Sequence, residues 1–245
     1  RIICLGSGIH NSNSDYPTET TLFQCALPKN YKRYIQTDPQ ILRDPFGNYF
    51  YVKDGEVQQA EGLQHSFHNK NKKATEGNFL TAWINHGKAP QNAQYEYLIL
   101  LQPTAEERKG ALESYTIQQH DNQAHILFDK LTQVTACAFF ETYNCTQAPF
   151  LQKADAETLV MYKPEGQSVW LSICSPNLNI SEKTYTTAQP SRPLIKQITV
   201  KGKWTVADNP QIRFLYDSDG NTVIQATCQD GQPQEFRLTS VQQTE

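Results

Sequence analysis

Among the residues that could do chemistry, lysines are grouped most closely between His65 and Lys73, in the segment His-Ser-Phe-His-Asn-Lys-Asn-Lys-Lys. Lys70, Lys72 and Lys73 form a local basic patch in a chain whose formal net charge is −3. Surface ammonium groups attract sulfates and carboxylates, and they raise association rate and retention more than specificity. We predict these three lysines as binding candidates for a polyanion, and a solvated loop without a ligand is the alternative.

The spacing of the other reactive residue types does not favour a metal site or nucleophilic catalysis. The cysteines, at positions 4, 25, 137, 145, 174 and 228, show no C-x-x-C spacing. His65 and His68 lie three apart on an expected loop, and no third ligand is near them. The chain contains no G-x-S-x-G, P-loop or dinucleotide-binding motif. We therefore predict no metal site and no catalytic residue in this segment.

Two weaker patterns stay open. Glu19, Glu76 and Glu96 lie on or beside expected strands, and two carboxylates facing one cleft could hydrolyse a glycoside. The aromatic stripes 49–51 and 95–97 could stack against sugar rings. The alternative for these stripes is that one face of each strand belongs to the core.

The composition favours strands and a soluble globular chain. Hydrophobic residues make up 38% of the chain, with twelve Tyr and eleven Phe against one Met. Aromatic and β-branched side chains suit a pleated, half-buried surface. The net charge gives no reason to expect nucleic acid as a partner. No apolar run approaches the roughly 20 residues that a membrane span needs.

Short alternating runs separated by turn residues predict antiparallel strands through most of the chain. Expected strands include 19–26, 79–84 and 95–101 in the first half. The second half continues with the same rhythm, for example at 168–174 and 222–228. Serial strands of this kind predict an all-β protein built from sandwiches.

One helix is expected, at about 104–118. Thr104 and Glu107 have the spacing of a capping box, in which each side chain bonds the backbone of the other residue. A single helix between two β-rich halves is a natural joint. We therefore predict domains at 1–120, including the linker helix, and at 121–245.

The chain opens on Arg1-Ile2-Ile3-Cys4-Leu5, which has the pattern of a strand already under way. It shows no initiator Met and no charged and apolar leader. We expect this chain to be a piece of a longer polypeptide.

Several segments, taken in order, resemble the C-terminal third of chondroitin sulfate ABC lyases. These enzymes belong to the polysaccharide lyase family that also holds hyaluronate and chondroitin AC lyases. The segments are Arg1–Gly6, Glu19–Gln24, Thr75–Phe79, Ala82–Gly87, Tyr95–Tyr97, Asp129–Leu131 with Val134–Thr135, Ser175–Asn179 and Gly202–Trp204. The resemblance extends over nearly the whole chain.

The resemblance implies an all-β architecture: the end of an antiparallel β supersandwich, a short linker helix, then a smaller C-terminal antiparallel β-sandwich domain. It also implies a parent lyase that cleaves glycosaminoglycan (chondroitin or dermatan sulfate, or hyaluronan) by β-elimination at uronic acid. In the family, the catalytic His, Tyr and Arg sit on an upstream helical toroid, and a Glu comes from an earlier part of the β region. No matching motif occurs here, so the segment alone is expected to be inactive.

The resemblance further implies a secreted or periplasmic bacterial enzyme, with the upstream toroid and a glycosaminoglycan as its partners. No cofactor is evident in this segment, whereas the parent enzyme could use calcium or magnesium. A stand-alone carbohydrate-binding β-sandwich module is the alternative function.

Overall fold

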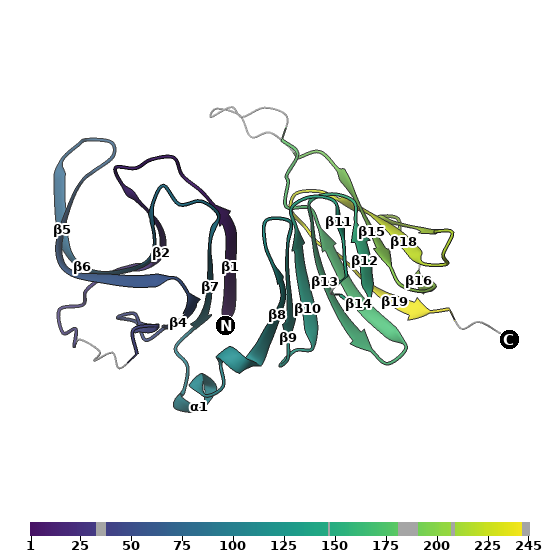
Figure 1. Cartoon of the computed structure of the whole chain (residues 1–245), viewed down its shortest axis with the longest axis horizontal. Helices are drawn as coiled ribbons and strands as arrows, with labels where there is room; N and C mark the ends of the chain where they lie inside the picture. The colour runs from purple at the N-terminus through teal and green to yellow at the C-terminus, as the bar shows by residue number, and fades with distance from the viewer. Residues whose placement is uncertain (33–37, 147, 181–190, 207–208, 242–245) are drawn as a thin grey trace. The chain divides into compact units, whose positions relative to one another are not determined.

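The computed structural model describes residues 1–32, 38–146, 148–180, 191–206 and 209–241. They form two compact units, Arg1–Glu113 and Ser114–Glu245, each built from antiparallel sheets (Figure 1). The predicted all-β fold class is confirmed. The predicted domains, 1–120 as the end of a supersandwich and 121–245 as a C-terminal domain, stay a prediction.

The strands of the first unit form two sheets. In spatial order, one sheet holds β1 (Ile2–Ile9), β7 (Ala93–Leu100), β4 (Tyr49–Asp54) and β3 (Ile41–Arg43). The other holds β2 (Pro17–Ala26), β6 (Ala74–Lys88) and β5 (Glu56–Phe67). Strand β5 pairs along its whole length with Ala74–Asn85 of β6 and makes a long hairpin, which is visible at the left of Figure 1.

The two sheets of the first unit share one apolar cluster. Its buried members are Phe23, Leu42, Phe50, Leu80 and Ala82. The rings of Phe23 and Phe50 approach to 4.9 Å between centroids, so strands β2 and β4 meet directly. This packing joins the sheet that carries the hairpin to the sheet that contains β4.

Gly55 allows the chain to pass from β4 in one sheet to β5 in the other. Its φ of +121° is one that side-chain-bearing residues rarely adopt. A β-carbon at this position would also collide with the side chain of buried Ile84. The Asp54-Gly55 dipeptide thus makes a turn between sheets, and β4 and β5 do not pair as a hairpin.

The expected helix is present only in its first turn. Helix α1 (Ala105–Arg108) has the predicted capping box, because Glu107 N donates to Thr104 Oγ1 and Thr104 N donates to the Glu107 carboxylate. A short 3-10 turn follows at Leu112–Ser114, and strand β8 (Tyr115–His120) occupies the predicted remainder. Pairing of β8 with its neighbour in the sheet overrides the local preference for helix.

The second unit is a sandwich of two sheets (Figure 1). In spatial order, the larger sheet holds β16 (Trp204–Val206), β19 (Gln234–Ser240), β14 (Ser168–Cys174), β13 (Thr158–Glu165), β10 (Val134–Phe139), β9 (Ala124–Asp129) and β8. The smaller sheet holds β11 (Tyr143–Asn144), β12 (Leu151–Ala154), β15 (Leu194–Val200), β18 (Thr222–Cys228) and β17 (Ile212–Tyr216).

The core of the second unit lies between these sheets and follows the alternation of each strand. In β14, Val169, Leu171 and Ile173 are 3%, 2% and 0% exposed and belong to the core. Because successive side chains of a strand point to opposite faces, Trp170 and Ser172 lie on the outer face of the same strand. The buried strand face therefore fixes which residues the sheet presents outward.

Candidate functional site

The three predicted lysines lie together in the loop that joins β5 to β6, at the tip of the long hairpin (Figure 1). We call residues 68–73 the basic loop. Its conformation is set by short-range hydrogen bonds: the backbone nitrogen of His68 donates to Lys73 O at 2.9 Å, and that of Lys72 donates to His68 O at 2.9 Å. Lys72 adopts a φ of +56°, which closes the turn.

Side chains of the loop reinforce this turn. The Nδ1 atom of His68 accepts from the backbone nitrogen of Lys70 at 3.3 Å, and Asn71 Oδ1 accepts from Lys73 N at 3.0 Å. His68 and Asn71 thereby serve as local caps. The two residues position the backbone from which the three lysine side chains extend.

The charges of the basic loop face solvent. Lys70, Lys72 and Lys73 are all exposed, and none forms an ion pair with a described residue. At the third residue pair of the hairpin from the loop, His65 Nδ1 lies 3.5 Å from the Glu76 carboxylate, and that pair is exposed as well. The loop is therefore an exposed cationic tip, which suits contact with a long anionic chain.

The two aromatic stripes differ in burial. Tyr49, Phe50 and Tyr51 are buried, so this stripe belongs to the interior. Tyr95 and Tyr97 are half-buried, with ring centroids 5.5 Å apart. Burial, together with a hydrogen bond to Cys4, raises the pKa of the Tyr97 phenol, so this hydroxyl stays protonated and cannot serve as a base near neutral pH.

Glu19 and Glu76 lie too far apart to form a glycosidase pair. Glu19 lies opposite Asn85 and Glu76 opposite His65, so the stretch of β6 from 76 to 85 separates them. Such a stretch spans on the order of 30 Å when extended, against the roughly 5–10 Å that paired catalytic carboxyl groups require. Glu96 lies on the other sheet and pairs with Lys53 at 2.7 Å.

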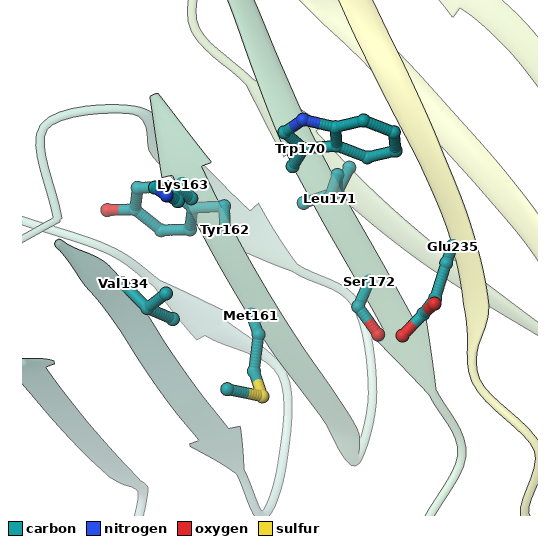
Figure 2. Close-up of a pocket in the computed structure, with 8 residues that line it drawn as sticks. All are labelled: Val134, Met161, Tyr162, Lys163, Trp170, Leu171, Ser172 and Glu235. Carbon is teal, nitrogen blue, oxygen red and sulfur yellow. The ribbon is translucent and has the colours of Figure 1, made fainter. Parts of the chain in front are cut away.

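A second surface lies on the outer face of the larger sheet of the second unit. Trp170 is 47% exposed and Met161 is 51% exposed on neighbouring strands β14 and β13. They border a shallow hollow of about 280 Å³ whose lining also includes Lys163, Ser172 and Glu235 (Figure 2). Sequence reasoning did not select this surface. The signal was available, because Trp170 stands at the outward phase of an alternating strand.

Clusters suited to a metal ion do not occur in the described part of the chain, where no three His, Cys, Asp or Glu side chains converge. All six cysteines are free thiols, and three of them, Cys137, Cys145 and Cys228, are buried. Burial raises the pKa of the Cys145 thiol to about 12, so this residue packs as a small apolar group and not as a ligand or nucleophile. None of the helices in the described residues has the length and apolar character of a membrane span.

Comparison with known proteins gives a family match for the first unit. Residues 1–111 match the super-sandwich domain of polysaccharide lyase family 8. The match covers the first unit alone, whereas the resemblance to chondroitin sulfate ABC lyases that the sequence motifs indicated is confirmed over most of the chain's length.

Two relatives show how similar the sequences are. The chain is 41% identical to the chondroitin sulfate ABC exolyase of Proteus vulgaris over 195 residues, covering 74% of this chain and 19% of the relative. It is 31% identical to the chondroitin sulfate ABC exolyase of Bacteroides thetaiotaomicron, covering 97% of this chain and 26% of the relative. The chain thus spans about a fifth to a quarter of the length of these relatives.

The fold has a solved counterpart. The chondroitin AC lyase of Streptomyces coelicolor A3, determined in complex with chondroitin sulphate, superposes with a TM-score of 0.73 at 16% identity. The superposition covers 98% of this chain and 31% of that lyase. At this identity the likeness establishes the β architecture alone.

Proposed function

We propose that this chain is the C-terminal β region of a glycosaminoglycan lyase that acts on chondroitin or dermatan sulfate, or on hyaluronan. The observation that carries this proposal is the 41% identity to a chondroitin sulfate ABC exolyase over 74% of the chain. In such a lyase the C5 proton of a uronic acid is removed while the carboxylate is neutralised and the leaving oxygen is protonated. This is general acid–base chemistry.

The proton-transfer groups of this reaction belong, in our proposal, to parts of the lyase outside these 245 residues. Support comes from the share of the relatives that the chain spans, 19% and 26%. The candidate carboxylates of the chain are separated or ion-paired, which also argues against an independent hydrolytic site. The enzyme would be secreted or periplasmic, with a helical toroid as the neighbouring domain.

The role that we assign to the first unit is electrostatic retention of the polymer by the basic loop. Lys70, Lys72 and Lys73 present three exposed ammonium groups on one short turn, in a chain of net charge −3. Sulfates and carboxylates recur along a glycosaminoglycan, so the loop can exchange one anionic group for the next. Contacts of this kind weaken when salt screens them, because exposed charges interact over about a Debye length.

The binding test compares two triple variants of the 245-residue chain. Changing Lys70, Lys72 and Lys73 to Ala should weaken binding to immobilised chondroitin sulfate roughly tenfold at low salt, and much less at high salt. The control changes the exposed Lys88, Lys201 and Lys203 to Ala, which removes the same formal charge elsewhere. Equal loss in both triples would show that only net charge matters and would contradict the role of the basic loop.

The alternative of a stand-alone carbohydrate-binding module has one observation in its favour, the exposed tryptophan of the second unit. It predicts sugar affinity in this chain whether or not the parent polypeptide is a lyase. The extent of the likeness to complete lyases favours the first proposal.

A further inference from the structure

Six side chains lie in two rows across strands β13, β14 and β19 on the outer face of the larger sheet. The first row is Lys163, Trp170 and Arg237, and the second is Met161, Ser172 and Glu235. Figure 2 shows the indole of Trp170 reaching toward β19, with Met161, Ser172 and Glu235 further along the strands. We call these six residues the Trp170 surface. By sheet geometry it measures roughly 10 Å across the strands and 7 Å along them.

Residues on both neighbouring strands, β13 and β19, contact the Trp170 side chain. Its Nε1 donates to the Glu165 carboxylate at 3.0 Å, and that carboxylate also lies 3.3 Å from Lys163 Nζ. The Arg237 guanidinium approaches the indole ring to 5.8 Å from the neighbouring strand. The backbone of Trp170 is fixed by the buried residues on either side, Val169 and Leu171. A ligand that meets this ring therefore loses little affinity to ordering of the side chain.

The charges around the ring balance. Lys163 and Arg237 supply two cations, while Glu165 and Glu235 supply two carboxylates. The hollow beside the ring is apolar along Met161 and polar at the Ser172 hydroxyl and the Glu235 carboxylate. A site with one aromatic wall, donors and acceptors at the rim and no excess charge matches a neutral ring that has an apolar face and hydroxyl or amide groups. It does not match a sulfate, which would need unbalanced cations.

We propose that the Trp170 surface is a sugar-binding subsite that takes a neutral pyranose of the N-acetylhexosamine class within a polysaccharide chain. The hexosamine would place its apolar face on the indole, with hydroxyl groups directed at Glu235 and Ser172. The identity of the polymer rests on the proposed function, whereas the pairing of ring and indole rests on the geometry of the second unit. The subsite complements the basic loop, because one contacts neutral rings and the other contacts anionic groups.

The experiment measures binding of an unsulfated chondroitin oligosaccharide to the 245-residue chain by calorimetry at low and high salt. Trp170→Ala should lower the affinity about tenfold at both salt concentrations, since stacking is not screened. The matched control is Ile195→Ala, an apolar residue 64% exposed on the other sheet of the same unit, which should leave the affinity unchanged. Equal affinity of Trp170→Ala and the unmodified chain would overturn the proposal.

Two further variants guard against a folding artefact. Trp170→Phe keeps an aromatic face and should retain most of the affinity. Glu235→Ala leaves the ring intact and should weaken binding several-fold by removing an acceptor. Unaltered affinity in Glu235→Ala, or the same loss in Trp170→Phe as in Trp170→Ala, would contradict stacking with rim hydrogen bonds.

Sedimentation separates a sugar from a protein as the occupant. Monomeric behaviour of the unmodified chain supports the sugar subsite. Self-association that Trp170→Ala abolishes would overturn it in favour of a second copy as the occupant.

Failure of the subsite alone would show as an unchanged Trp170→Ala affinity beside an intact lysine effect. Failure of the proposed function would show as absent β-elimination in the longer polypeptide, whatever the sugar affinity.

Discussion

The basic loop and the Trp170 surface are both exposed, but they are held in opposite ways. The loop is fixed by hydrogen bonds within one hairpin turn, such as that from Lys72 N to His68 O. The Trp170 surface is fixed by three paired strands that lie on a buried core. A charge-based contact therefore needs only a local turn, whereas a stacking contact needs the register of a whole sheet.

The largest effect is expected where the core supports the Trp170 surface. Leu171 is 2% exposed and lies on β14 next to Trp170. Leu171→Ala should lower the unfolding free energy by about 2–5 kcal/mol, because it removes buried apolar contacts and leaves a cavity. Denaturant unfolding measures this, with exposed Ile195→Ala as a control that should stay within about 0.5 kcal/mol.

The same variant tests whether the two surfaces bind independently of each other. Under conditions where Leu171→Ala unfolds the second unit, the salt-sensitive binding of chondroitin sulfate by the basic loop should persist. Loss of both binding modes together would show that the two surfaces are not independent.

A smaller effect is expected at the turn that connects the two sheets of the first unit. Gly55→Ala places a β-carbon at φ +121° and against Ile84, so we expect a loss of about 1–3 kcal/mol in the first unit. Gly166→Ala is the control, because its φ is +60° and no atom lies within 4 Å of the added carbon. Thermal unfolding should rank Gly55→Ala as the more harmful change, and the reverse order would refute the proposed collision.

The smallest effect concerns acid sensitivity of the second unit. His125 packs edge-on against Phe140 and His120, with ring centroids 4.9 Å apart in both cases. Burial and, to a lesser extent, the neighbouring His120 lower the pKa of His125 from 6.5 to about 4, while Asp121 acts in the opposite direction. Below pH 6.5, His125 binds a proton in the unfolded chain but not in the folded chain. The free energy of unfolding therefore falls as the pH drops from 6.5 toward 4.

His125→Gln should therefore reduce the pH dependence of the thermal midpoint within that window. His10→Gln, at an exposed histidine of the first unit, should leave the dependence unchanged. An identical pH profile for His125→Gln and the unmodified chain would contradict the depressed pKa. Neither change should alter binding through the basic loop.

Sequence patterns predicted the local features of the fold but not those that depend on the pairing of strands. The alternation of apolar residues was enough to predict an all-β chain, and the Thr104–Glu107 capping box was correct in detail. The helix was predicted too long because residues 115–120 become a strand through pairing with β9, a contact that no local pattern reports. The grouping of the three lysines on one loop could be predicted from their spacing alone, and their role in binding stays a prediction.

The Trp170 surface could be predicted only in part. Alternation in Ser168–Cys174 places Trp170 outward, as the structure confirms. Lys163 lies opposite Trp170 in the hairpin of β13 and β14 and is local in sequence, whereas Arg237 comes from β19, which becomes a neighbour of β14 only after folding. Sequence separation therefore concealed the charge balance that gives the surface its character.

The absorbance of unsaturated uronate, followed while the 245-residue chain is incubated with chondroitin sulfate, shows whether these strands carry proton-transfer groups. We predict no increase above the protein-free control, although the chain binds the polymer, because its groups hold sugar and do not transfer the C5 proton. A sustained increase that survives repeated purification would place proton-transfer groups within these strands and contradict the account.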